Sequence, residues 1–179
     1  MDYVLRLAKC KAEACVKTAH PGETIIAADT AVTVDGDILG KPRSPQEAVA
    51  MLRQLRGRRH LVCTGYTIKD VDLGTLVAGL CTTDVPMRSY TEAEIQAYTL
   101  TGDPLDKAGA YAIQHVGFHP VETLAGCYAS VMGLPLCHLA RSLRTMNISP
   151  VTDLPAACQS ALKYTCPIFS QVLAGEDIG

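Results

Sequence analysis

The segment from Thr24 to Pro42 constrains the fold more than any other part of the chain. It begins with an apolar, β-branched run that alternates toward Asp35-Gly36, and a second apolar run then leads to Lys41. Asp-Gly between alternating apolar residues is a strong signal for a β-hairpin, because both positions of a two-residue type I′ turn need positive φ. The segment therefore predicts two antiparallel strands joined by a tight turn.

The register of this hairpin brings a carboxylate and an amine near each other. Val34 pairs with Asp37 across the turn, and the same register places Lys41 opposite Thr30, one residue from Asp29. Opposed residues share a face of a sheet and successive residues alternate, so strict pairing puts Lys41 on the face of Thr30. Two interpretations stay open: a functional acid and base, or a surface ion pair at the mouth of the hairpin.

Length and composition predict one globular domain. The chain has 179 residues, of which 48% are hydrophobic, and it can bury a core of its own. Its formal net charge is −2 and it has no long basic run, so nucleic acid is not expected as a partner. No apolar stretch approaches the ~20 residues of a membrane span, and the start does not resemble a signal peptide. We expect a cytoplasmic protein whose eight cysteines stay reduced, because no C-x-x-C pair is present.

The pattern along the chain predicts an α/β domain with a mixed sheet and flanking helices. Helical spacing and capping boxes predict helices at residues 3–17, from Ser44, from Thr91 and from Pro135. Further strands are expected at residues 60–69, at 75–85 and in a short run that ends at Gln114. At least two connections are hairpins, which a purely parallel sheet does not contain. Residues 147–179 are expected to form one or two short helices or a loosely packed tail.

Two lysine-bearing loops and one carboxylate are the candidate chemical groups. The loops are Leu39-Gly40-Lys41-Pro42 and Leu105-Asp106-Lys107-Ala108-Gly109, and Asp29 lies on a predicted strand. Backbone amides beside glycine can approach an anion while an ammonium group acts as a mobile point charge. A carboxylate can hold a divalent cation or take a proton from water. These groups suit attack on a polyphosphate, and the alternative is two hairpin lysines with an aspartate at a strand end.

Three blocks of the sequence resemble the Maf family of septum-formation-inhibitor-like nucleotide pyrophosphatases. The blocks are Ala27 to Gly65 with Asp35-Gly36 and Gly40-Lys41-Pro42, Gly102 to Gln114 with Asp106-Lys107-Ala108-Gly109, and Gly126 to Leu136. They occur in the family's order, and the resemblance as a whole runs from about residue 3 to 145. The resemblance predicts a Maf-like nucleotide pyrophosphatase domain at residues 1–146 and a C-terminal extension at 147–179.

The resemblance also implies a fold and an activity. The fold is expected to be an elongated α/β structure related to the inosine-triphosphate pyrophosphatases, with a cleft between two lobes. The activity is hydrolysis of a nucleoside triphosphate to the monophosphate and pyrophosphate, as a house-cleaning reaction. It is expected to need Mg²⁺ or Mn²⁺ and to occur in a homodimer.

The resemblance assigns roles to charged residues by their family positions. Asp29 would be the general base or a metal-linked acid, and Lys41 and Lys107 would bind phosphates. Lys11, in the family's Lys-Ala helix motif as Lys11-Ala12, would be a third cation in the cleft.

Two further positions are linked to base selectivity, Thr30 and Gln114. A glutamine after Tyr-Ala-Ile is similar to the subgroup that acts on dTTP and UTP. Its amide has donor and acceptor edges, which suit the alternating carbonyl and N–H edge of a pyrimidine. Methylated GTP is the alternative substrate.

The family pattern normally starts with a strand that ends in a serine and paired arginines, and this sequence contains no such segment. An arginine fork clamps phosphate through two parallel hydrogen bonds, which lysine does not reproduce. Either residues upstream are absent from this sequence, or this is a shortened member of the family. In the second case the alternative to an active dTTP/UTP pyrophosphatase is a catalytically impaired nucleotide-binding protein.

Overall fold

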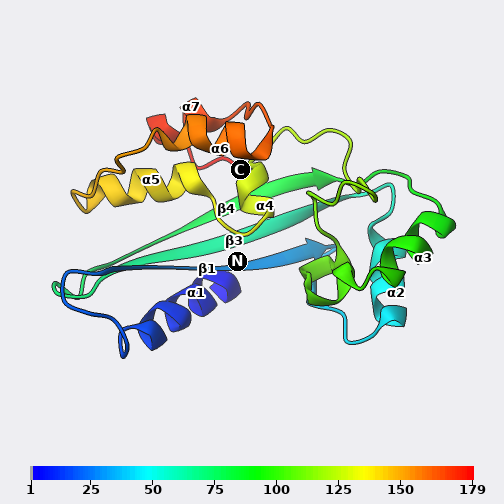
Figure 1. Ribbon diagram of the computed structural model, residues 1–179, viewed down its shortest axis with the longest axis horizontal. Helices are drawn as coiled ribbons and strands as arrows, with labels where there is room; N and C mark the ends of the chain where they lie inside the picture. The colour runs from blue at the N-terminus through cyan, green and yellow to red at the C-terminus, as the bar shows by residue number, and fades with distance from the viewer. Residues whose placement is uncertain (1) are drawn as a thin grey trace. The chain divides into compact units, whose positions relative to one another are not determined.

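The computed structural model describes residues 2–179 (Figure 1). Its helices are α1 (Asp2–Cys15), α2 (Pro45–Leu55), α3 (Glu92–Leu100), α4 (Tyr128–Val131), α5 (Leu136–Thr145), α6 (Leu154–Leu162) and α7 (Phe169–Ala174). Its strands are β1 (Thr24–Val34), β2 (Asp37–Leu39), β3 (Arg59–Asp70) and β4 (Leu76–Pro86). Two short 3₁₀ helices follow α3, η1 (Asp103–Asp106) and η2 (Ala108–Ala110). The expected α/β class is confirmed.

The four strands form one antiparallel sheet in the order β2-β1-β3-β4. The sequence pattern predicted a mixed sheet, and the observed sheet differs in this detail because all its neighbouring strands are antiparallel. The reason is the path through α2, which connects β2 to β3. These two strands run in the same direction, but both pair with β1 instead of with each other, so no parallel ladder forms.

The predicted hairpin is confirmed, and its ladder ends early. The paired residues are Val32 with Leu39, Thr33 with Ile38, and Val34 with Asp37. Asp35 and Gly36 have φ values of 53° and 88°, as a type I′ turn requires. Strand β2 stops at Leu39, so the ladder does not extend to Lys41 as strict register predicted. Lys41 lies in the loop that leads to α2.

The chain divides into two compact units. Unit 1 holds the residues up to Thr30 together with 63–83 and 125–179, and unit 2 holds 31–62 and 84–124. Each of the long strands β1, β3 and β4 contributes residues to both units. The expected cleft and the division at residues 1–146 and 147–179 stay predictions.

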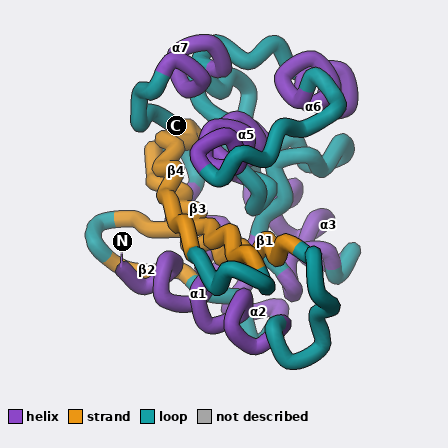
Figure 2. The backbone as a smooth tube through the Cα atoms, turned by 90° about the vertical axis from the view of Figure 1, so that its left-hand side faces the viewer, coloured by secondary structure: helices purple, strands orange, loops and turns teal. Residues whose placement is uncertain are grey.

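In unit 1, helices α1 and α5 cover opposite faces of the sheet (Figure 2). A Cβ on Gly65 of β3 would lie 2.8 Å from the backbone nitrogen of Leu5, so glycine at this position allows α1 to approach closely. The next residue, Tyr66, points to the other face. Its hydroxyl donates to the His138 carbonyl and is hydrogen-bonded to Ser142 of α5. This alternation is the normal period of a strand.

The helices of unit 1 follow the sequence pattern closely. Val4, Ala8 and Ala12 are buried on one face of α1 as predicted, but Cys15, expected on the same face, is exposed. Residues 147–179 form the short helices α6 and α7, as expected. Arg141 of α5 holds this segment by donating to the Glu176 carbonyl at 2.9 Å. None of the helices in residues 2–179 is long and apolar enough to cross a membrane.

Unit 2 is built on α2 and α3, and both helices begin at the predicted caps. Ser44 accepts a hydrogen bond from the Glu47 backbone, and Thr91 and Glu94 form a complete capping box. The short strand expected to end at Gln114 does not form. Gly109 and the following residue have φ values of 69° and 61°, which bend the chain out of an extended conformation.

Candidate active site

Lys11 and Asp29 form an ion pair within unit 1. The Lys11 ammonium donates to Asp29 Oδ1 at 2.5 Å and to the Ala28 carbonyl at 2.9 Å. The Asp29 side chain is only 17% exposed, whereas that of Lys11 is 54% exposed. The carboxylate is therefore held in one orientation while the ammonium group reaches solvent. A carboxylate fixed in this way can take a proton from water or bind a divalent cation.

Thr30 lies on the other face of β1 from Asp29. The Thr64 hydroxyl of β3 donates to the Ser130 carbonyl at 2.8 Å, so the Thr30 hydroxyl donates to Thr64, also at 2.8 Å. Thr64 is fully buried. These three residues, the hydroxyl array of Thr30, Thr64 and Ser130, link β1 and β3 to α4. The structure thus separates Thr30 from the charged pair.

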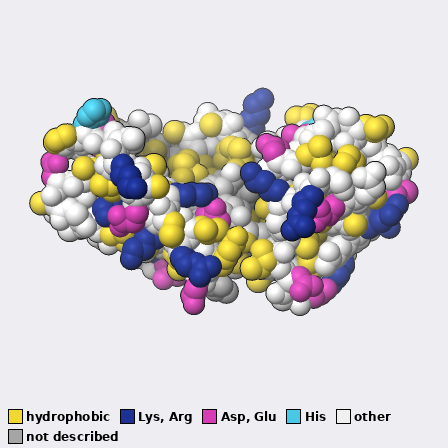
Figure 3. Space-filling model, turned by 90° about the horizontal axis from the view of Figure 1, so that it is seen from below, with side chains coloured by type: hydrophobic (Ala, Val, Ile, Leu, Met, Phe, Trp, Pro, Cys, Tyr) yellow, Lys and Arg dark blue, Asp and Glu magenta, His cyan; other side chains and the backbone are white. Residues whose placement is uncertain are grey.

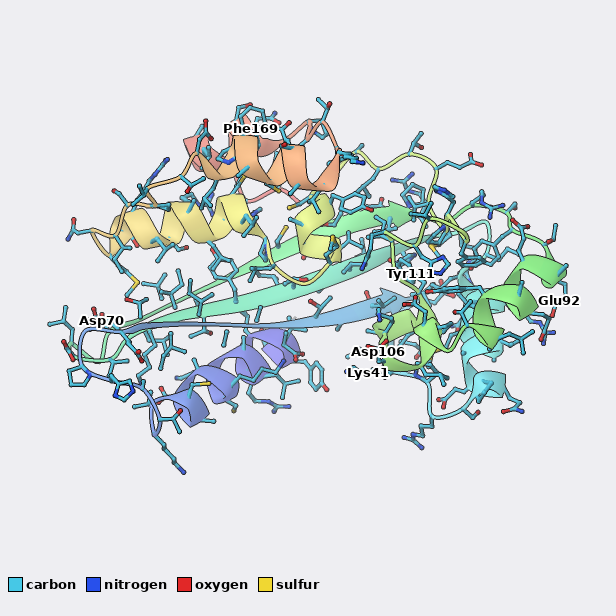
Figure 4. The ribbon with its side chains drawn as sticks, viewed as in Figure 1. Lys41, Asp70, Glu92, Asp106, Tyr111 and Phe169 are labelled. Carbon is cyan, nitrogen blue, oxygen red and sulfur yellow. The ribbon has the colours of Figure 1, made fainter. Side chains whose placement is uncertain are left out.

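In unit 2, the two predicted lysine loops lie together. The backbone N–H of Gly109 donates to the Gly40 carbonyl at 3.1 Å, which joins the loop of Lys41 to the loop of Lys107. Figure 4 shows Lys41 beside Asp106. The hydrogen bond from Lys107, with Lys41 nearby, lowers the pKa of Asp106. The structure therefore brings both Lys41 and Lys107 near one carboxylate, that of Asp106.

The two loop lysines differ in how strongly they are already paired. Lys107 forms ion pairs with Asp106 and, at 3.7 Å, with Asp103. Lys41 is exposed and forms no ion pair with another residue of the described part, 2–179. On the face shown in Figure 3, by contrast, Lys and Arg side chains mostly lie beside Asp and Glu side chains. An unpaired ammonium group is free to bind an incoming anion.

Gln114 is exposed at the end of a buried segment of unit 2. Tyr111 anchors that segment through a 2.8 Å hydrogen bond between its hydroxyl and His60 Nε2. The backbone N–H of Ala112 donates to the Tyr98 hydroxyl at 3.0 Å. The exposed Gln114 amide therefore follows a segment that hydrogen bonds of Tyr111 and Ala112 hold in place.

Sequence reasoning did not single out Thr64 and Ser130, the buried members of the hydroxyl array. A usable signal existed for Thr64, because the apolar strand expected at residues 60–69 carries polar residues there and at Thr67. No comparable signal marks Ser130, whose carbonyl is the atom involved.

Residues 2–179 contain no group of three His, Cys, Asp or Glu side chains that could bind a metal ion without help from a ligand. Asp29 therefore offers a single carboxylate. Mg²⁺ commonly binds through one or two carboxylates together with substrate phosphates and water. The residues present fit an ion that is shared with a phosphorylated ligand.

Both units thus present lysines suited to a phosphorylated ligand on an α/β scaffold. The Maf-like protein family matches residues 1–146, and the chain belongs to this family, as the sequence analysis predicted. A dTTP/UTP pyrophosphatase of Methylobacillus flagellatus is 48% identical over 149 residues, which cover 83% of this chain and 74% of the relative.

Two more relatives have the same printed name, dTTP/UTP pyrophosphatase. The protein of Anaeromyxobacter dehalogenans is 46% identical over 145 residues, covering 80% of this chain and 72% of the relative. The protein of Dehalococcoides mccartyi is 43% identical over 143 residues, covering 80% of this chain and 63% of the relative. The chain thus spans less than two thirds of the length of the last relative.

Proposed function

We propose that this protein hydrolyses dTTP and UTP to the nucleoside monophosphate and pyrophosphate. The observation that carries the proposal is the Lys11–Asp29 pair, an oriented carboxylate with an exposed cation beside it. Membership of the Maf-like family and the names of relatives at 43–48% identity support the same reaction and substrates.

In this proposal, Asp29 takes the proton of the water molecule that attacks the α-phosphorus. The new P–O bond forms as the bond to the β-phosphate bridging oxygen breaks, and pyrophosphate leaves. Lys11 keeps the carboxylate in place through its 2.5 Å hydrogen bond. A positioned general base typically contributes about 10²- to 10⁴-fold to the rate.

Lys41 and Lys107 are proposed to bind phosphate oxygens and to offset the charge of the leaving pyrophosphate. The unpaired state of Lys41 and the 3.1 Å hydrogen bond between the two loops support a shared task. Asp29 is the proposed protein ligand of Mg²⁺ or Mn²⁺. Such an ion, when bound, neutralises charge on the triphosphate.

The remaining assignments are proposals of the same kind. The exposed amide of Gln114 is proposed to recognise the pyrimidine edge. Thr30 is proposed to affect base selectivity through the hydroxyl array that positions it. A cytoplasmic homodimer is proposed from the family resemblance.

A panel of nucleoside triphosphates tests the proposal. Each is incubated with the protein and Mg²⁺, and pyrophosphate is measured separately from orthophosphate. We expect dTTP and UTP to give monophosphate and pyrophosphate in equal amounts. Release of orthophosphate, binding without hydrolysis, or hydrolysis of methylated GTP alone would contradict the proposed function.

The variant Asp29→Asn tests the assigned base with an unchanged side-chain shape. We expect kcat to fall about 100-fold or more, the lower range for loss of a general base. Asp37→Asn is the matched control, because Asp37 is exposed on the hairpin. Wild-type turnover in Asp29→Asn would show that the role assigned to Asp29 is wrong.

A further inference from the structure

Cysteines that are far apart in the sequence gather in unit 1. Cys127, Cys137, Cys158 and Cys166 line one cavity of about 20 Å³ beneath α6. Cys81 of β4 packs against Cys127 in the same buried cluster. The sequence predicted scattered, reduced thiols, and the spacing of the cysteines along the chain contains no pair that indicates this cluster.

The sulfur of Cys81 lies among buried hydrogen-bond donors. Cys81 is 1% exposed, and the neighbouring side chains of Ser130 and His138 are 0% and 1% exposed. Ser130 Oγ and both ring nitrogens of His138 have no regular hydrogen-bond partner in residues 2–179. Buried polar groups normally have partners. A thiolate at Cys81 would accept a hydrogen bond from the Ser130 hydroxyl and from one ring N–H of His138.

The two sulfurs of the Cys81–Cys127 pair are chemically different. A hydrogen bond from the Cys127 thiol, with His138 and Ser130 nearby, lowers the pKa of Cys81 despite its burial. The same hydrogen bond and burial raise the pKa of Cys127. A thiolate is the nucleophilic and oxidisable form of cysteine, and a neighbouring thiol is the usual resolving group. The pair therefore has one reactive and one resolving sulfur.

We propose that Cys81 and Cys127 are a peroxide-reactive pair that closes to a reversible disulfide. The Cys81 thiolate attacks one oxygen of hydrogen peroxide, the O–O bond breaks, and a sulfenic acid and hydroxide form. The Cys127 sulfur then attacks the sulfenic sulfur, an S–S bond forms, and the S–O bond breaks. Two thiols and one peroxide thus give one disulfide and two water molecules.

The surroundings of the pair suit this chemistry. The adjoining cavity of about 20 Å³ has room for one water-sized molecule, so a small oxidant can reach the Cys127 side of the pair. Cys81 and Cys127 already pack in one buried cluster, and side-chain rotation has to bring their sulfurs to the ~2.05 Å of a disulfide. A dithiol reductant reverses the reaction by thiol–disulfide exchange.

Cys127 also directly precedes α4, which carries Ser130 of the hydroxyl array. A bond between Cys127 and Cys81 therefore joins β4 to the turn that supports Thr30. The disulfide itself does not rest on the proposed nucleotide hydrolysis, and its test needs no activity measurement.

The test treats the intact, reduced protein with hydrogen peroxide and blocks the remaining thiols before denaturation. We expect the count of free thiols to fall by two from eight and to return after dithiothreitol. Trypsin should then release residues 70–88 joined to 108–141, with fragmentation placing the bond at Cys127 and not Cys137. Retention of all eight thiols, or oxidation confined to the exposed Cys10 and Cys15, would overturn the proposal.

Single variants test the different roles of the two sulfurs. In Cys127→Ser, whose hydroxyl can still donate to the Cys81 sulfur, Cys81 should stop at the sulfenic acid, which dimedone traps on residues 70–88. In Cys81→Ala, Cys127 should keep its thiol under the same treatment. Cys137→Ala is the matched control, since it removes another buried thiol of the cavity and should leave the cross-link intact. Equal oxidation of Cys127 with and without Cys81 would contradict the assigned roles.

Discussion

Asp29 and Thr30 are consecutive residues of β1 whose side chains lie on opposite faces of the sheet. Asp29 is paired with Lys11 of α1, whereas Thr30 is hydrogen-bonded to Thr64 and through it to α4. One strand therefore carries a charged pair on one face and a buried hydroxyl array on the other. Substitutions on the two faces should have different consequences, the first for catalysis and the second for stability.

Removal of the Lys11 ammonium should reduce activity more than stability. In Lys11→Met, Asp29 loses the 2.5 Å hydrogen bond that orients it, and the proposed site loses a cation. We expect kcat/KM for dTTP to fall about tenfold, while the free energy of unfolding changes by no more than about 1 kcal/mol, because the pair is partly exposed.

Lys9→Met is the control for this substitution, because Lys9 is exposed on the same helix. Steady-state kinetics and urea unfolding of both variants provide the comparison. Equal kinetic effects in the two variants would mean that the Lys11–Asp29 pair has no special role.

The hydroxyl array should contribute to stability through Thr64. Thr64→Val keeps the shape of the side chain but leaves the Thr30 hydroxyl and the Ser130 carbonyl without their partner. We expect the free energy of unfolding to fall by about 1 to 3 kcal/mol, the cost of buried groups left unpaired. Urea denaturation measures the difference.

Thr67→Val on the same strand is the matched control. Thr67 is also fully buried, but its hydroxyl has no hydrogen-bond partner within residues 2–179. Removing that hydroxyl should be neutral or stabilising, since a buried unpaired polar group is itself unfavourable. If Thr67→Val destabilises as much as Thr64→Val, the effect comes from packing and not from the array.

Short-range sequence patterns predicted the parts of the fold that depend on residues close together in the chain. Asp35-Gly36 specified its turn, Thr91 with Glu94 specified the start of α3, and helical spacing specified α5. Each depends on residues a few positions apart. The pairing of β3 with β1 depends on residues more than 30 positions apart, such as Thr30 and Thr64, so local patterns did not predict the strand directions correctly.

The sequence identified residues of the candidate site but did not place all of them correctly. Family positions named Lys11 and Asp29, and the structure brings these two together. Strict hairpin register misplaced Lys41, because β2 ends at Leu39 and a hydrogen bond from Gly109 then directs the loop. The sequence did not predict the cluster around Cys81, because its members come from separate strands and helices.

Acid should destabilise the protein through His60. Burial lowers the pKa of His60 from 6.5 to about 4, so the unfolded chain binds a proton that the folded chain does not between these values. Stability from the neutral imidazole is therefore fully present above pH 6.5 and is lost as the pH falls toward 4. Linkage gives a loss of about 2 kcal/mol between pH 7 and pH 5.

His60→Gln removes the titrating group and can still bond to the Tyr111 hydroxyl, which His60 Nε2 contacts at 2.8 Å. The variant should be less stable at pH 7, but its free energy of unfolding should fall about 2 kcal/mol less than that of the wild type on going to pH 5. Urea unfolding at both pH values measures the two slopes. Parallel slopes would show that other groups cause the acid sensitivity.

The last prediction concerns Gly109, which places the Lys107 loop in unit 2. Its φ is +69°, and an added Cβ would lie 3.0 Å from a methyl group of the buried Val32 side chain. Gly109→Ala thus combines backbone strain, about 1 to 2 kcal/mol for a left-handed residue, with a steric clash that shifts the loop.

Gly74 is the matched control, because its φ is +65° and an added Cβ meets nothing within 4 Å. Gly74→Ala should cost only the backbone strain of about 1 to 2 kcal/mol and leave dTTP hydrolysis unchanged. Gly109→Ala should cost more in urea unfolding and also raise KM for dTTP, because Lys107 follows the displaced loop. Equal losses of stability with unchanged KM in both variants would show that close packing at Gly109 does not position the lysine.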